Sequence, residues 1–314
     1  RFRSKALDVV IAIGGGSVLD AAKAIAGLLP HGNSVMDHLE GVGRNIPFHG
    51  PSTPFIAVPT TAGTGSEATK NSVLSVAGRD GFKKSFRDEC LIPEYAVIDP
   101  DLLASCPREL VAADGMDAFT QLLESYVSIK ANPFIDALAW SGIGAVKEGL
   151  FAAWEGIEPS ASHGRGAMAY AALLSGITLA QVGLGSVHGL ASPLGAYFHI
   201  PHGVVCGTLV AAATEANIKA MQAREPDNKA LAKYAQVGRL LTDSPETDDV
   251  TARSSLIALL AEWSEKLQLP RLHSYGITAN DFPLIVANSR GSSMQTNPIV
   301  LTGAEINAIL TQRL

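Results

Sequence analysis

The chain has 314 residues, of which 47% are hydrophobic and 17% charged, so it is long and apolar enough to form two domains with full cores. Its net charge of −6 at pH 7, without any run rich in Lys or Arg, argues against a surface for nucleic acid or anionic membranes. The three cysteines, Cys90, Cys106 and Cys206, lie far apart and match no disulfide or metal spacing, so we expect reduced thiols in a cytoplasmic protein.

The N-terminal part begins with the pattern of a strand, a glycine turn and a helix. Residues 7–13 form a β-branched run that ends in Gly14-Gly15-Gly16, and a segment of helical character follows. Ser17 is predicted to cap that helix, with Asp20 as its reciprocal partner. Glycines let a backbone approach a ligand closely, and a helix N-terminus attracts phosphate, so we favour phosphate binding over an ordinary turn. Leu19 stands at the third glycine position of the dinucleotide fingerprint, so the turn is not of that type.

Two further buried strands are predicted, at residues 55–58 and 95–98. The first runs into residues 59–67, PTTAGTGSE, whose hydroxyl groups and glycines suggest a second loop that faces a ligand. The second is closed by Asp99-Pro100. Strands separated by helical or loop segments indicate a parallel α/β sheet, which binds ligands at the carboxyl ends of its strands.

After Asp99-Pro100 the strand patterns end and a helical periodicity rich in Ala and Leu continues to Leu314. We therefore predict an α/β domain over residues 1–104 and an all-helical domain over residues 105–314. Amphipathic helices are expected in the tail, at residues 228–241, 252–267, 279–289 and 303–312.

One stretch of the second half, from Gly166 to Thr214, contains no Asp, Glu, Lys or Arg but holds His188, His199 and His202. Its later part predicts a buried helix, a break and a second helix. A membrane-spanning helix is the less favoured alternative, because the stretch carries Gln181, several hydroxyl residues and prolines and has no basic anchors. For any one of these histidines, a satisfied core position is the common case, and a metal ligand is the alternative.

An acidic helix upstream favours the metal-ligand alternative for these histidines. Asp117 and Gln121 are four residues apart and share a helix face, with Glu124 one further turn along. Asp117 could be a simple helix charge. Together with His188 and His202 it would instead provide one carboxylate and two imidazoles, a set suited to Zn²⁺ or Fe²⁺.

These motifs resemble the iron-containing (group III) alcohol dehydrogenase family. The resemblance covers the chain from about Leu7 onward and rests on four blocks in the family's order, which are residues 14–17, 59–67, 115–118 and 188–202. It implies a nucleotide-binding α/β domain, with a parallel sheet that is incomplete at its N-terminus, followed by an all-α metal-binding domain.

The resemblance also implies roles for individual residues. The cofactor pyrophosphate would lie against Gly15, Gly16, Ser17 and Asp20. The nicotinamide side would be lined by Thr60, Thr61 and Thr64, with Lys83 near a ribose. Asp117, His188 and His202 match three of the family's four metal ligands and would be the catalytic residues. Gln121 stands where the fourth ligand is usually histidine, and Ser192 replaces a second histidine of the family.

The implied activity is that of an NAD(P)-dependent alcohol dehydrogenase or aldehyde reductase, with Fe²⁺ or Zn²⁺ as its metal. Small alcohols or aldehydes would be its substrates, in a homodimer without nucleic-acid or membrane partners. One alternative is a metal- and NAD-dependent lyase of dehydroquinate synthase type, although the basic residues that such an acidic substrate needs are missing from residues 166–214. The other is a catalytically impaired nucleotide-binding relative, which Gln121 and Ser192 make plausible.

Overall fold

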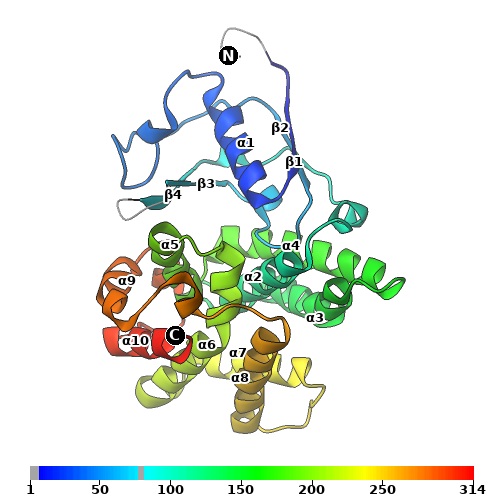
Figure 1. Cartoon of the computed structure of the whole chain (residues 1–314), viewed down its shortest axis with the longest axis vertical. Helices are drawn as coiled ribbons and strands as arrows, with labels where there is room; N and C mark the ends of the chain where they lie inside the picture. Colours follow the sequence, from blue (N-terminus) through cyan, green and yellow to red (C-terminus); the bar gives the residue numbers. More distant parts are fainter. Residues whose placement is uncertain (1–6, 77–80) are drawn as a thin grey trace.

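The computed structural model describes residues 7–76 and 81–314, which form an α/β part above a larger helical part (Figure 1). The sheet of the α/β part has three parallel strands in the order β1-β2-β5. Their bounds are β1 Val10–Gly14, β2 Phe55–Pro59 and β5 Tyr95–Ala96. The predicted parallel sheet is thus confirmed, with each strand within a few residues of its expected position.

Helix α1 (Gly16–Leu28) covers one face of this sheet (Figure 1). Its residues Leu19, Ala22 and Ala26 pack against Ala12, Phe55 and Ala57 of the strands. On β1 the alternate side chains Ile11 and Ile13 are exposed by 58% and 64%, so apolar burial is confined to the α1 side of that strand.

The predicted cap of α1 is wrong. Its N-cap residue is Gly15, no side chain of the described residues caps it, and Ser17 lies exposed in its first turn. The side chain of Asp20 turns inward, where its carboxylate accepts hydrogen bonds from Ser66 Oγ (2.6 Å) and Val73 N (3.2 Å). Because β1 ends at Gly14, the helix starts too early for Ser17 to stand before it. In the first turn Val18 N donates to Gly15 O at 2.9 Å, and the N–H groups of Gly16 and Ser17 stay available.

A β-hairpin that was not predicted lies beside α1. It consists of the antiparallel strands β3 (Asn71–Val76) and β4 (Phe82–Arg87). The fully buried Lys23 of α1 holds the start of the hairpin against this helix. Its Nζ donates to Thr69 Oγ1 (2.8 Å) and to Asn71 O (2.9 Å). Short 3₁₀ turns connect the elements of this part, at Val35–Asp37, Ser66–Ala68, Glu89–Leu91 and Pro100–Leu103.

The remainder is helical, as predicted, and the described residues after β5 include no strand. Its helices are α2 Arg108–Val127, α3 Pro133–Glu155, α4 Ser160–Val182, α5 Ser186–Phe198, α6 His202–Arg224, α7 Lys229–Leu241, α8 Asp249–Lys266, α9 Phe282–Asn288 and α10 Gly303–Gln312. Three 3₁₀ turns lie between the later helices, at Leu272–Tyr275, Ala279–Asp281 and Met294–Thr296. Helix α2 is the central one, because every residue from Gly115 to Val127 is buried.

The charge-free stretch forms most of α4, all of α5 and the first half of α6. The predicted helix, break and helix are confirmed: α5 ends where His199 adopts a left-handed φ of +55°, and Pro201 precedes α6. Helix α6 is long and apolar enough to cross a membrane, but 78% of its apolar window is buried inside the protein. The absence of charged residues from its first half is typical of a core helix.

Candidate functional site

Two carboxylates of α2, those of Asp117 and Glu124, lie in the middle of the helical core, where the residues are 0% and 5% exposed. A buried carboxylate is costly unless positive or hydrogen-bonding groups compensate it. The groups that surround each carboxylate therefore indicate its role.

Glu124 is compensated by the N-terminus of α5. Its Oε2 accepts from Gly185 N (2.8 Å) and its Oε1 from Val187 N (2.7 Å), and the helix dipole adds a favourable field. The Nδ1–H of His188 also donates to Oε2, at 2.7 Å. This bond fixes the orientation of the ring, so His188 Nε2 is directed away from Glu124.

That nitrogen faces Asp117. The distance from His188 Nε2 to Asp117 Oδ1 is 3.2 Å, and His202 Nε2 lies 3.7 Å from the same oxygen. Cys206 is the fourth member of the cluster: one ligand atom from each of these four residues lies within 4.8 Å of every other. The structure thus brings together three predicted residues and one that was missed.

The signal for Cys206 is present in the sequence. It follows His202 by four residues, so the two side chains share a face of α6. The spacing between cysteines alone cannot reveal a site that a cysteine shares with histidines. Burial raises the pKa of the Cys206 thiol to about 12, so the group is protonated unless a cation binds it.

The donors of this cluster fit a divalent cation. The buried atoms Asp117 Oδ2, Gln121 Oε1 and His202 Nδ1 have no hydrogen-bond partner among the described residues. Burial, with the nearby Lys83 ammonium, lowers the pKa of His202, so its ring is neutral near pH 7 and cannot balance the charge of Asp117. Carboxylate, imidazole and thiol are the donors that Zn²⁺ and Fe²⁺ accept.

The cluster is open on one side. The side chain of His202 is 28% exposed, against 5% for His188 and 1% for Asp117. Lys83 of β4 lies close to α5 and to His202. Its Cδ is 3.7 Å from the position that a Cβ on Gly195 of α5 would occupy, and its ammonium lowers the pKa of His202. Burial lowers the pKa of Lys83, and its nearest opposite charges come from both parts of the chain, among them Asp117 and Asp20.

The predicted cofactor residues of the sheet lie in two adjacent turns. A Cβ on Gly16 would be 2.5 Å from Thr64 Oγ1, and one on Gly15 would be 3.2 Å from Thr61 Cγ2. Thr60 N donates to Gly14 O at 3.0 Å and joins the turns at their base. The glycines are thus required by contact between the turns, whose outer sides combine threonine hydroxyl groups with the N-terminus of α1.

The threonine loop also contacts the helical part directly. Gly65 has a φ of +61° and lies against Gly176 of α4, where a Cβ on Gly176 would be 2.1 Å from Gly65 O. Ser175 Oγ donates to Gly63 O at 3.3 Å. Only glycine at both positions permits this backbone contact, which fixes the loop relative to the helices.

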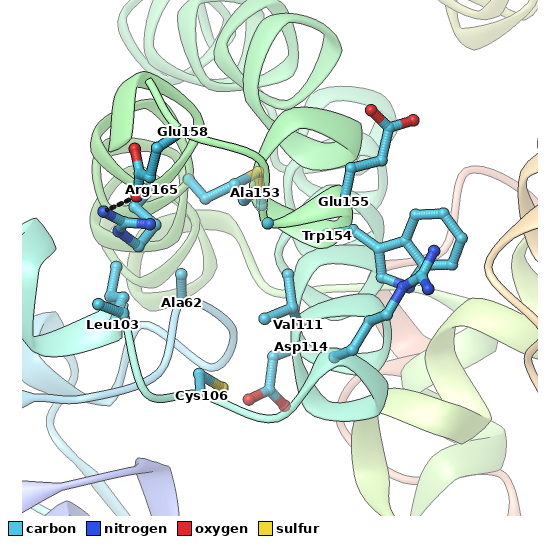
Figure 2. Close-up of a pocket in the computed structure, with 14 residues that line it drawn as sticks. Ala62, Leu103, Cys106, Val111, Asp114, Ala153, Trp154, Glu155, Glu158 and Arg165 are labelled. Atoms are coloured by element: carbon cyan, nitrogen blue, oxygen red, sulfur yellow. Dashed lines mark ion pairs between the residues drawn. The ribbon is translucent and has the colours of Figure 1, made fainter. Parts of the chain in front are cut away.

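A separate cavity of about 290 Å³ lies beside this loop, with Ala62 in its wall (Figure 2). Figure 2 shows Asp114 and Cys106 on one side of it and the ion pair of Glu158 with Arg165 (2.8 Å) on the other. None of the four cluster residues lines it. Burial, with Asp117 nearby, raises the pKa of Asp114 to about 7, while a hydrogen bond from Thr61 acts in the opposite direction.

Comparison with known proteins identifies relatives along the whole chain. The family model described as iron-containing alcohol dehydrogenase matches residues 1–100, and the model of the C-terminal region of Fe-containing alcohol dehydrogenases matches residues 111–314. Alcohol dehydrogenase 4 of Saccharomyces cerevisiae is 34% identical over 306 residues, which is 96% of this chain and 75% of that protein.

Solved structures of similar fold also match nearly the whole chain. The crystal structure of a 1,3-propanediol oxidoreductase has a TM-score of 0.88 and 30% identity, and the match covers 100% of this chain and 78% of that one. A sulfoacetaldehyde reductase from Bifidobacterium kashiwanohense, solved in complex with NAD⁺, has a TM-score of 0.82 and 27% identity, covering 99% of this chain and 77% of that one.

We expect Glu124→Gln to weaken metal binding by about 10–100-fold, the range typical of residues that orient a metal ligand. A glutamine offers one acceptor where Glu124 offers two, so His188 or the backbone of α5 would meet an N–H donor. Competition with a chelator measures the effect, and Glu148→Gln, on an exposed position of α3, is the control. Equal chelator midpoints in both variants would contradict the role given to Glu124.

Asp114 predicts a pH dependence of stability. Because its folded pKa is raised from 3.8 to about 7, the folded state retains a proton that the unfolded chain loses, and stability falls as pH rises through this interval. The neutral variant Asp114→Asn removes this effect, so its melting temperature should gain on the wild type from about pH 4 to pH 7 and level off above. Asp227→Asn, at an exposed position, should show a constant difference, and a constant difference for Asp114→Asn would refute the assignment.

Proposed function

Because the chain belongs to the iron-containing alcohol dehydrogenase family, we propose that its buried cluster holds the divalent cation and its two turns hold the nicotinamide cofactor. The chain is an oxidoreductase that acts on CH–OH groups, and the resemblance stated from the sequence is confirmed. The observation that carries the proposal is the convergence of Asp117, His188 and His202 on one point in the charge-free core.

In this proposal Asp117, His188 and His202 bind the cation, with Gln121 as a further amide donor on the same face of α2. When bound, the cation supplies Lewis acidity that polarises the substrate oxygen, and the nicotinamide supplies the site that exchanges hydride with the substrate carbon. Glu124 holds the ring of His188 in place. The buried walls of α2, α5 and α6 keep water from Asp117, and the substrate oxygen approaches on the exposed side of His202.

The cofactor would lie across the carboxyl ends of β1 and β2. Gly15, Gly16 and Ser17 at the uncapped start of α1 present N–H donors to the pyrophosphate, and Thr60, Thr61 and Thr64 line the nicotinamide side. Asp20 supports these turns from within through Ser66. Lys83 lies between the cofactor turns and the metal cluster, where an ammonium group can contact a ribose.

The substrates that this arrangement favours are small primary alcohols and their aldehydes. The oxidoreductase for 1,3-propanediol among the similar structures supports that class. The free cysteines, the net negative charge and the burial of most of α6 support a place in the cytoplasm. The homodimer is proposed from the family resemblance alone.

The metal role is tested with Asp117→Asn and His202→Ala. Each should lower turnover of NAD(P)H with a panel of short alcohols and aldehydes by more than about 100-fold, because even residues outside the ligand set typically contribute about 10–100-fold. Elemental analysis should show loss of metal, and circular dichroism should show an intact fold. His163→Ala, at an exposed position of α4, is the control. Full activity after the metal is stripped would refute the role.

The cofactor role is tested with Gly16→Val, which displaces Thr64 and covers the first N–H groups of α1. We expect NADH to bind about 10-fold or more weakly, equivalent to about 1.4 kcal/mol. Titration by NADH fluorescence measures this affinity. Gly144→Val is the matched control, because a side chain at that helical glycine would meet no atom within 4 Å. Unchanged affinity in a folded Gly16→Val protein would mean that the turn does not contact the cofactor.

A further inference from the structure

Cys206 is the residue of the buried cluster that neither the sequence motifs nor the family resemblance assigns. It is 0% exposed, and its Sγ lies 3.6 Å from His188 Nε2 and 3.9 Å from His202 Nε2. It belongs to α6, the helix that also contributes His202. A thiol in this place needs an explanation beyond packing, because it touches the nitrogen atoms that are proposed to bind the cation.

The four donor atoms are spaced like the corners of a metal tetrahedron. Bonds of about 2.0–2.3 Å from Zn²⁺ to nitrogen, oxygen and sulfur would place neighbouring ligand atoms about 3.3–3.7 Å apart. Four of the six separations among Asp117 Oδ1, the two imidazole nitrogens and Cys206 Sγ run from 3.2 to 3.9 Å, and all six are within 4.8 Å. A cation could therefore contact all four atoms with only small side-chain adjustments.

Charge favours the same arrangement. Asp117 and a Cys206 thiolate together carry two negative charges, which a divalent cation balances, while both histidine rings stay neutral. A site without net charge suits this core, since an uncompensated charge is costly at such depth. As the sulfur–metal bond forms, the thiol proton is released to solvent.

We propose that Cys206 is a metal ligand and completes, with Asp117, His188 and His202, a set of one carboxylate, two imidazoles and one thiolate. The proposal rests on the metal-binding role proposed above for this cluster. Thiolate is a soft donor, so the set favours Zn²⁺ over Fe²⁺ and over Mg²⁺. Gln121, with a neutral amide oxygen, is then the weaker donor, and the strong fourth ligand comes from α6 and not from α2.

Substitution with Co²⁺ tests the proposal on the full chain without reference to activity. A thiolate bound to Co²⁺ gives a ligand-to-metal charge-transfer band in the near ultraviolet, which oxygen and nitrogen ligands do not give. We expect this band in the wild type and in the double variant Cys90→Ser/Cys106→Ser, which keeps Cys206 as its one cysteine. We expect its loss in Cys206→Ser, with zinc affinity lowered by more than about 100-fold, beyond the range of outer residues.

The variant Gln121→Ala separates the two candidate donors. It should keep the band and change zinc affinity only a few-fold. If Gln121→Ala loses cobalt while Cys206→Ser retains it, the fourth position belongs to the amide and the proposal is wrong.

The outcomes also separate this proposal from the one it rests on. Cobalt bound by the wild type without a charge-transfer band overturns the role of Cys206 but leaves the metal site. Absence of any cobalt binding overturns both. Should Cys206→Ser fail to fold, the spectra of the wild type and the double variant still decide, because they contain every ligand under test.

Discussion

The arrangement of the helical part of this enzyme depends on two buried carboxylates, whose negative charge needs hydrogen-bond donors or positive charge beside it. Glu124 and Asp117 lie two turns apart on α2, where every surrounding residue is buried. Glu124 obtains its partners from the start of α5, from two backbone N–H groups and His188. Asp117 is surrounded by two imidazole rings and a thiol, and its Oδ2 has no partner among the described residues. The same core therefore contains a completed structural carboxylate and one whose charge calls for a cation.

The two proposed sites are coupled by the loop that follows β2. Its Gly65 meets α4 backbone to backbone, while Gly63 lies against Asp114 of α2, one turn before Asp117. A displacement of the threonine loop would thus be transmitted to the helix that carries Asp117, the proposed metal ligand. Contacts of this kind hold reacting groups in a fixed geometry, because glycine at the contact leaves no flexible side chain to absorb a shift.

Local patterns in the sequence predicted the elements that depend on local chemistry. The glycine turn, the threonine loop and the charge-free helices all appear, because composition and spacing alone specify them. The hairpin of β3 and β4 was missed, since Lys83-Lys84-Ser85 in the middle of β4 breaks the apolar alternation that marks a strand. The partners of Glu124 could not be predicted either, because Gly185 and Val187 approach it only through the packing of α5 on α2.

The cluster, and not the cavity of Figure 2, is the place that the proposed function gives to the reaction. The wall of the cavity in Figure 2 contains Asp114 and an arginine paired with Glu158, and no cluster residue. At the cluster, His202 is the partly exposed member, and β4 packs against the neighbouring helix α5. Lys83 there interacts with charges of both parts of the chain. Under the proposed function, an alcohol that enters between β4 and His202 would meet both the cation and the cofactor turns. An alcohol in the cavity would meet Ala62 of the threonine loop but no residue of the cluster, so the proposal places the reacting atoms between β4 and α6.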